Sequence, residues 1–208
     1  MEFRSVCWQI VCVFLSALLF NGTISAEETD NSLYVYNEAG NETYLWYPSG
    51  WMPDGGGISY TDRFKEACHR GETCIKAGFQ TGKKPYWAGI YWLPVGSWQG
   101  PGIDIYKSLN VDKKVHIKLT FWAKGMTGKE RVQFKVGGVA DGKDSIKFPA
   151  ETDYVTLSTE WKQYMIDLVD KDLSNIVGGF CWVANKDQNR GQSEVWFFLD
   201  DIRYEVVK

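Results

Sequence analysis

This sequence of 208 residues lacks a strong charge of either sign, because its formal net charge is only −3. Proteins that bind nucleic acids mainly through the phosphate backbone carry a pronounced basic patch or stripe. The charge balance therefore predicts no nucleic-acid partner.

Long apolar runs are also absent, with one exception at the N-terminus. Arg4 precedes an apolar run over residues 6–20, and small and polar residues follow up to Ala26. This is the layout of a signal peptide, and the run is too short for a typical membrane span. We expect a signal peptide over 1–26, a lead-in over 27–32 and one domain over 33–208. The weakly basic start leaves an uncleaved anchor as the alternative. The expected location is secreted, periplasmic or in the cell envelope, with no stable membrane insertion after cleavage.

Cysteine and histidine are scarce, with five and two residues in the whole sequence. A structural zinc site needs four such ligands close together, and the stretch "CHRGETC" has no second close cysteine pair. In an exported protein, Cys68 and Cys74 are expected to form a disulfide. Cys181 lies within an apolar run and is expected to be a buried free thiol.

Extended helical periodicity is missing, and strand-like alternation takes its place. "VHIKLTFWAKG" (115–125), "RVQFKVGGV" (131–139) and "WKQYMIDL" (161–168) alternate apolar and polar side chains, and Gly-rich links separate such runs. Several short strands without intervening helices predict an all-β, antiparallel β-sandwich or jelly roll. Single helical turns are expected in "TDRFKEAC" (61–68) and "DLVDKDLSNI" (167–176).

Recognisable catalytic motifs are absent as well. The nearest approach to the Glu-x-Asp-x-Glu of retaining glucanases is "ETDYV" at 151–155, which lacks the third carboxylate. There is no Gly-x-Ser-x-Gly elbow and no His-Glu-x-x-His zinc motif. The sequence therefore favours a protein that is not an enzyme. The alternative is a secreted glycan-active enzyme whose carboxylates are dispersed in the sequence.

Four stretches together resemble a known group of proteins: "HRGETCIKAGF", "GIDIYKSLNVDKKVHIKLTFWAKG", "STEWKQYMIDL" and "VWFFLDDIRYE". They are similar to secreted β-sandwich modules with the galactose-binding-like fold, which include many cellulose- and xylan-binding modules. The resemblance covers most of residues 33–206. It implies a galactose-binding-like jelly roll and a structural calcium ion held by Asp200, Glu38 and backbone carbonyls near residues 70–72. Calcium prefers several oxygen ligands of this mixed kind.

Tryptophan is abundant, with ten residues in the sequence. Sugars present flat, weakly apolar faces, and exposed tryptophan rings bind such faces over a large area. Trp161 and Trp196 are expected to pack in the core. The expected sugar-binding aromatics are Trp51, Trp92, Trp98, Trp122 and Trp182. The expected polar rim, in the loop after Trp182, consists of Lys186, Gln188 and Asn189.

These features predict non-catalytic binding of a polysaccharide or another glycan outside the cytoplasm, by an aromatic-lined face of the sandwich. The same fold also serves other interactions. The main alternative is therefore an envelope or matrix module that holds a protein partner. A contiguous exposed apolar patch would favour that alternative.

Overall fold

The computed structural model describes residues 31–94, 98–139 and 144–207. The predicted signal peptide and residues 27–30 of the lead-in lie outside these ranges. No helix in the described ranges has the length and apolar character that crossing a membrane requires.

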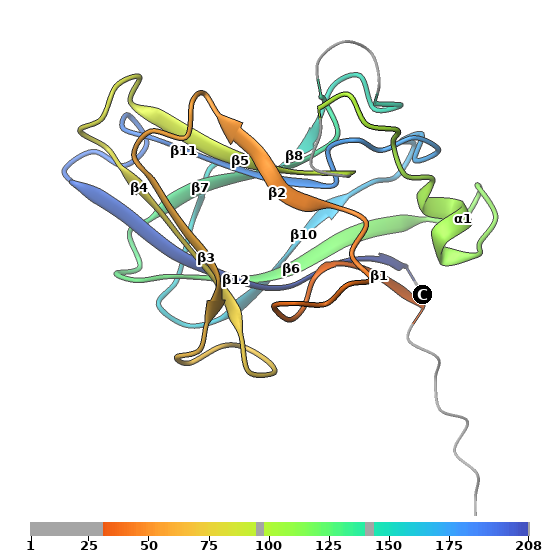
Figure 1. Cartoon of the computed structure of the whole chain (residues 1–208), viewed down its shortest axis with the longest axis horizontal. Helices are drawn as coiled ribbons and strands as arrows, with labels where there is room; N and C mark the ends of the chain where they lie inside the picture. Colours follow the sequence, from red (N-terminus) through yellow and green to blue (C-terminus); the bar gives the residue numbers. More distant parts are fainter. Residues whose placement is uncertain (1–30, 95–97, 140–143, 208) are drawn as a thin grey trace, which may run out of the picture. The chain divides into compact units, whose positions relative to one another are not determined.

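Two antiparallel sheets face each other across one core, which confirms the predicted all-β sandwich (Figure 1). Sheet A contains β1 (Ser32–Tyr36), β3 (Ile58–Phe64), β4 (Cys74–Gln80), β6 (Ile117–Gly125), β10 (Lys162–Asp167) and β12 (Glu194–Val206). Sheet B contains β2 (Tyr47–Met52), β5 (Trp87–Leu93), β7 (Arg131–Val136), β8 (Ala150–Glu151), β9 (Val155–Thr156) and β11 (Phe180–Asn185). The strand order is β10-β6-β12-β4-β3 in sheet A, with β1 on β12, and β2-β5-β11-β7-β8 in sheet B, with β9 on β7.

The alternating runs read from the sequence place their apolar side chains in the core as expected. Leu119 and Phe121 of β6 are fully buried, as are Val132 and Phe134 of β7. The rings of Phe121 and Phe134 lie 4.5 Å apart and join the two sheets. A strand exposes alternate residues to opposite faces, so these core residues also decide which neighbours point outward.

Strand β12 is apolar on both faces, which makes its sequence pattern ambiguous. Phe197 points into the core and pairs with Ala77, whereas Trp196 pairs with Gly78 and packs on the outside of sheet A. The prediction that Trp196 is a core residue is therefore wrong. Trp161 also lies outside the core, half-buried, and its indole N–H donates to the carbonyl of Ala67 at 2.9 Å.

The single described helix, α1 (Ile105–Leu109), falls outside both expected helical turns. The carboxylate of Asp104 caps it by accepting a 3.1 Å hydrogen bond from the backbone N–H of Lys107. The first expected turn overlaps the end of β3, where pairing with β4 keeps the backbone extended. Residues 168–176 after β10 form turns and a single bridge between Ile103 and Ile176.

Candidate functional site: the outer face of sheet B

The outer face of sheet B collects one aromatic, one apolar and one polar zone. Because Ile90 and Trp92 of β5 point into the core, Gly89 and Tyr91 point outward. The antiparallel register then places Cys181 beside Tyr91 and Lys135, and Val183 beside Gly89 and Gln133. We call this surface the sheet-B face. Its side chains come from Met52, Trp87, Tyr91, Cys181, Val183, Asn185, Gln133 and Lys135, and the ring of Trp98 packs on it.

Trp98 supplies the exposed aromatic ring of the sheet-B face. Its side chain is 39% exposed, and its ring meets the ring of Tyr91 edge-on with the centroids 5.6 Å apart. The ring lies against β2 at Gly50, where an added Cβ would come within 2.8 Å of it. Gly50 therefore allows Trp98 to pack directly on the strand backbone.

Tyr91 supports Trp98 from below. Its hydroxyl donates to the carbonyl of Gly137 at 3.1 Å. Burial raises the pKa of Tyr91 well above its ordinary value, so the phenol remains a neutral donor. Burial likewise raises the pKa of the neighbouring Cys181 thiol, which is fully buried and unreactive as a nucleophile.

An apolar strip continues from Trp98 across the sheet. Met52 and Val183 both pair with Gly89, from opposite sides, and both are half-buried against the Tyr91 cluster. Trp87 pairs with Asn185 at the end of the same strands and is also half-buried. The strip therefore extends across β2, β5 and β11 and along β5 as far as Trp87, and it is only partly covered.

Polar side chains flank this strip on the β7 and β8 side. Lys135 and Glu151 form an ion pair of 2.7 Å. The side-chain amide of Gln133 donates to the carbonyl of Thr152 at 3.0 Å. These bonds hold polar groups at the surface in fixed orientations, which lowers the entropy cost of binding hydroxyl groups.

Two of the five predicted sugar-binding tryptophans are core residues instead. Trp92 is 1% exposed and Trp182 is fully buried, and their rings pack on Phe180 and Phe197 respectively. Each lies in phase with core residues of its own strand, so neither can contact a ligand. The predicted binding role of Trp92 and Trp182 is therefore wrong.

The other predicted aromatics lie on different surfaces. Trp51 is 38% exposed, but it pairs with the inward-facing Ile90 and meets the ring of Tyr60 edge-on at 5.7 Å. Trp122 lies on the outside of sheet A, where the ring of His69 stacks on it at 3.7 Å. The structure therefore separates Trp51, Trp98 and Trp122 onto three surfaces.

The predicted polar rim is also divided. Asn189 is 1% exposed, and its amide group bonds the backbone N–H and carbonyl of Arg131 at 2.8 and 2.9 Å. It anchors the β11–β12 loop to β7, so its predicted contact with sugar is wrong. Gln188 is half-buried, and Lys186 is exposed with its ammonium group 4.7 Å from the ring centre of Tyr86.

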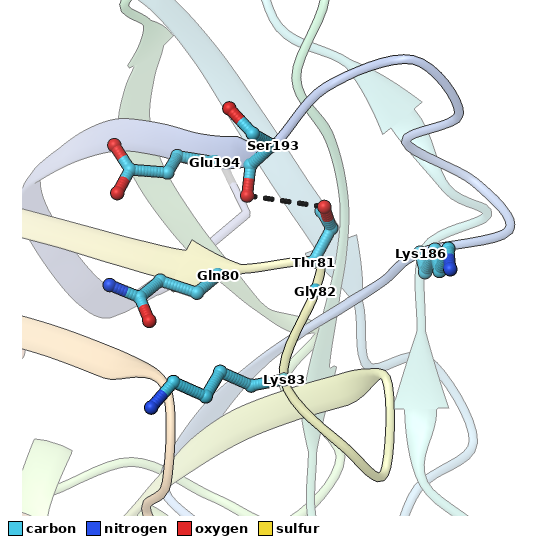
Figure 2. A pocket seen from close by; sticks show the side chains of 7 residues that line it. All are labelled: Gln80, Thr81, Gly82, Lys83, Lys186, Ser193 and Glu194. Carbon is cyan, nitrogen blue, oxygen red and sulfur yellow. Dashed lines mark hydrogen bonds between the residues drawn. The ribbon is translucent and has the colours of Figure 1, made fainter.

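Lys186 borders an open hollow of about 430 Å³ at the loop end of the sandwich (Figure 2). The hydroxyl of Thr81 donates to the carbonyl of Ser193 at 3.1 Å and joins the two loops behind it. Figure 2 shows the side chains of Glu194, Gln80 and Lys83 in a row on one side, with Lys186 on the other, and Glu194 and Gln80 are neighbours across β12 and β4. The hollow is therefore rich in donors and acceptors but has no aromatic wall.

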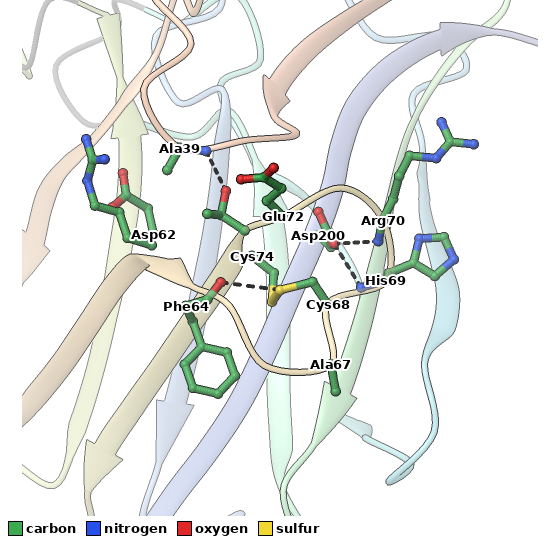
Figure 3. The surroundings of a disulfide bond; sticks show 12 residues. Ala39, Asp62, Phe64, Ala67, Cys68, His69, Arg70, Glu72, Cys74 and Asp200 are labelled. Atoms are coloured by element: carbon green, nitrogen blue, oxygen red, sulfur yellow. Dashed lines mark hydrogen bonds between the residues drawn. A yellow bond between two sulfur atoms is a disulfide. The ribbon is translucent and has the colours of Figure 1, made fainter.

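The carboxylates of the predicted calcium site are occupied by backbone donors. Asp200 accepts from the N–H groups of His69 and Arg70 at 3.0 and 3.1 Å (Figure 3). Glu38 accepts from the N–H groups of Glu72 and Thr73 at 2.6 and 3.0 Å. Donors aimed at both carboxylates leave no shell of oxygen ligands for a cation, and the described residues contain no cluster of three metal-ligating side chains. Asp200 and Glu38 therefore do not fit the expected calcium ion, and both instead hold the loop over residues 65–73.

A disulfide joins Cys68 and Cys74, the pair expected from the sequence (Figure 3). It closes the same loop that Asp200 and Glu38 hold. Among the described residues, Cys181 is the free cysteine, and it is buried as expected.

The sequence did not single out Met52, Trp87, Tyr91 and Val183 as residues of the outer face of sheet B, where Tyr91 is buried beneath Trp98 and the other three are half-buried. The signal was present in "WAGIYWL", where Trp87, Gly89 and Tyr91 share one phase of the strand. The opposite phase contains Ile90 and Trp92 and is equally apolar. Alternation alone could not decide which of the two phases faces the core.

Comparison with known proteins supports the fold. No family model and no curated protein matches the sequence. A solved structure of a family 30 carbohydrate-binding module is 15% identical, with a TM-score of 0.60 over 85% of this chain and 88% of that chain. The family 30 module of a cellulosomal cellulase of Clostridium thermocellum is 15% identical, with a TM-score of 0.55 over 84% and 96%.

A family 11 carbohydrate-binding module from Clostridium thermocellum, solved in complex with a β-1,3-1,4-mixed-linked tetrasaccharide, is 13% identical to this chain. Its TM-score is 0.50 over 81% of this chain and 93% of that chain. These likenesses confirm the β-sandwich that the sequence resemblance implied.

Proposed function

We propose that this protein binds a polysaccharide or another glycan, without catalysis, on the sheet-B face. The observation that carries the proposal is the exposed ring of Trp98, supported by Tyr91 and continued by the apolar strip beside fixed polar side chains. Aromatic rings take the flat faces of sugars, and oriented polar groups bind the hydroxyls at their edges. Carbohydrate-binding modules with similar folds support this choice.

Export of the mature chain is part of the same proposal, because the proposed glycan lies outside the cytoplasm and the protein must be exported to reach it. It depends on the expected signal peptide. N-terminal sequencing of the exported protein tests this part by showing whether the chain begins near residue 27.

Affinity electrophoresis against soluble glucans, xylans, mannans and uronates tests binding. We expect one polymer to retard the mature chain, and Trp98→Ala to remove most of the retardation. Trp196→Ala is the matched control, because Trp196 is half-buried on the outside of sheet A. Retardation that depends on Trp196 instead would move the site to sheet A. No retardation by any polymer would contradict the proposal and favour a protein partner.

A further inference from the structure

A cavity of about 200 Å³ lies at the edge of the sandwich. There, β3 is the edge strand of sheet A and β2 is the edge strand of sheet B. The chain between β1 and β2 forms one side, and residues of β3 form another. We call it the edge pocket. Its walls come from Val35, Tyr36, Gly40, Asn41, Tyr44, Trp46, Tyr47, Pro48, Tyr60, Asp62, Arg63 and Trp92.

The edge pocket is separate from the sheet-B face. Trp92 pairs with Phe180 and points to the inside of the sandwich, and Tyr60 pairs with the core residue Ala77. The rings of Tyr60 and Trp92 meet edge-on at 6.0 Å and close the pocket from within. The sheet-B face lies on the opposite side of sheet B, because it is built from the outward phase of the same strands.

Aromatic rings form the walls, and hydrogen bonds hold several of them in place. The hydroxyl of Tyr44 accepts from the N–H groups of Asn37 and Glu38 at 2.6 and 2.8 Å. The indole N–H of Trp46 donates to a backbone carbonyl at 3.3 Å, and the hydroxyl of Tyr36 donates to the carbonyl of Asp62 at 2.7 Å. The pocket is therefore largely preformed, and binding costs little ordering of these rings.

Three polar groups at the edge pocket have no partner among the residues that the structure describes. The hydroxyl of Tyr60 is buried without a hydrogen bond. The carboxylate of Asp62 and the guanidinium of Arg63 take part in no described hydrogen bond or ion pair. Figure 3 shows the Asp62 side chain on the far side of the disulfide loop from His69. A buried hydroxyl without a partner is costly, so such a group is worth explaining by a ligand.

The hydroxyl of Tyr60 interacts electrostatically with other groups that line the edge pocket. Burial raises its pKa well above the ordinary value, and the nearby Asp62, Tyr36 and Tyr44 raise it further. All three of these neighbours line the edge pocket. The neutral phenol is thus a hydrogen-bond donor near the unpaired carboxylate of Asp62, and the unpaired guanidinium of Arg63 supplies further donors in the lining of the same pocket.

We infer that the edge pocket binds a single pyranose unit. Its aromatic walls offer flat apolar contact, and a carboxylate with a guanidinium at the rim matches neighbouring sugar hydroxyls, which both donate and accept. Walls on several sides and a volume below that of drug-sized pockets limit the ligand to about one ring. The unit is either the end of a glycan chain or a free monosaccharide. The inference rests on the proposed function only in taking a sugar as the ligand.

Saturation-transfer NMR and calorimetry with a panel of methyl pyranosides test this inference. We expect Asp62→Ala and Arg63→Ala to weaken binding of one pyranoside roughly tenfold or more, since each removes a charged hydrogen-bonding group. Arg70→Ala is the matched control, because that exposed arginine lies in the disulfide loop. Neither Asp62 nor Arg63 has a described side-chain bond to lose, so folding should be unaffected, and thermal melting of each variant checks this.

Oligosaccharides of the same sugar distinguish the two sources. Tighter binding than that of the monosaccharide, lost when one chain end is chemically blocked, identifies a chain end. Equal binding identifies a free monosaccharide. The inference is overturned if no pyranoside binds, or if Asp62→Ala and Arg63→Ala bind like the unaltered protein.

The two proposals fail separately in this design. Polymer retardation that depends on Trp98, combined with unaltered behaviour of Asp62→Ala, overturns the edge pocket alone. Pyranoside binding that depends on Asp62, without retardation by any polymer, overturns the proposed function of the sheet-B face alone.

Discussion

The backbone N–H of His69 donates a 3.0 Å hydrogen bond to the carboxylate of Asp200, which follows 131 residues later in the chain. The neighbouring Asp201 has a left-handed backbone with φ of 47°, and the pairing of β12 with β6 shifts register between Asp200 and Arg203. This β-bulge explains two adjacent aspartates in an apolar strand. Asp200 turns outward and anchors the disulfide loop.

The pH dependence of stability should reflect Asp200. Burial raises its pKa from 3.8 to about 6, despite the backbone N–H groups that lower it. Because the folded pKa lies above the unfolded one, its stabilising contribution is present below about pH 4 and is lost as the pH rises through about 6. We expect the melting temperature of Asp200→Asn, relative to the unaltered protein, to rise from about pH 4 to about pH 7. A difference that is constant with pH would contradict this assignment.

Removing divalent cations should leave stability unchanged. Backbone N–H groups already donate hydrogen bonds to the carboxylates of Asp200 and Glu38. These carboxylates therefore do not need a calcium ion to stabilise them. We expect equal melting temperatures in a chelator and in excess calcium. A clear increase in melting temperature with calcium would mean that a cation binds elsewhere or displaces these donors.

The disulfide should contribute measurably to stability. Cys68 and Cys74 are separated by six positions, and closing a loop of this size in the unfolded chain corresponds to about 2 kcal/mol. We expect the free energy of unfolding of the double variant Cys68→Ser, Cys74→Ser to be lower by that amount. The variant should therefore unfold at a lower denaturant concentration. A reductant should destabilise the unaltered protein and leave the double variant unaffected, which serves as the internal control.

Trp182 and Trp98 should separate stability from binding. Trp182 is fully buried against Phe197, so Trp182→Ala should lower the free energy of unfolding by about 3–5 kcal/mol. Trp98 is 39% exposed, so Trp98→Ala should cost much less stability and act mainly on glycan binding. Chemical denaturation of both variants gives the comparison. Similar losses of stability would contradict the assignment of Trp98 to the surface.

Asn189 should act as a structural anchor of the loop after β11. Its amide satisfies both backbone groups of Arg131, and its removal would leave buried groups without partners. We expect Asn189→Ala to cost about 1–3 kcal/mol and to speed amide hydrogen exchange at Arg131. Gln188→Ala is the matched control, since that half-buried side chain has no described hydrogen bond. Equal effects of the two substitutions would argue against the anchor.

The fold could be predicted from the sequence because alternation has a direct structural meaning. In "RVQFKV" the apolar residues occupy one phase only, so Val132, Phe134 and Val136 could be assigned to the core and were found there. In "EVWFFLDD" both phases are apolar, and Trp196 was assigned to the wrong side. Its actual place depends on Gly78 of the neighbouring strand, which no local pattern reports.

The candidate site was harder to predict because surface aromatics and core aromatics have the same composition. Trp92 and Trp98 are six positions apart, yet one is buried and the other exposed. The polar loop after Trp182 has the donors and acceptors that suit a sugar, but Asn189 uses its amide for the backbone of Arg131. Composition suggested a class of ligand, but it did not show which aromatic side chains lie at the surface.

The sequence by itself determined the all-β sandwich and the pairing of Cys68 with Cys74, because strand periodicity and close cysteine spacing are local properties. Only the tertiary structure decided that Trp98 rests on Tyr91 and Gly50, that Trp92 and Trp182 fill the core, and that Asp62 and Arg63 flank an edge pocket. These relationships depend on sheet register and on contacts between distant strands. A one-residue change of register reverses every side chain of a strand, so no local pattern specifies them.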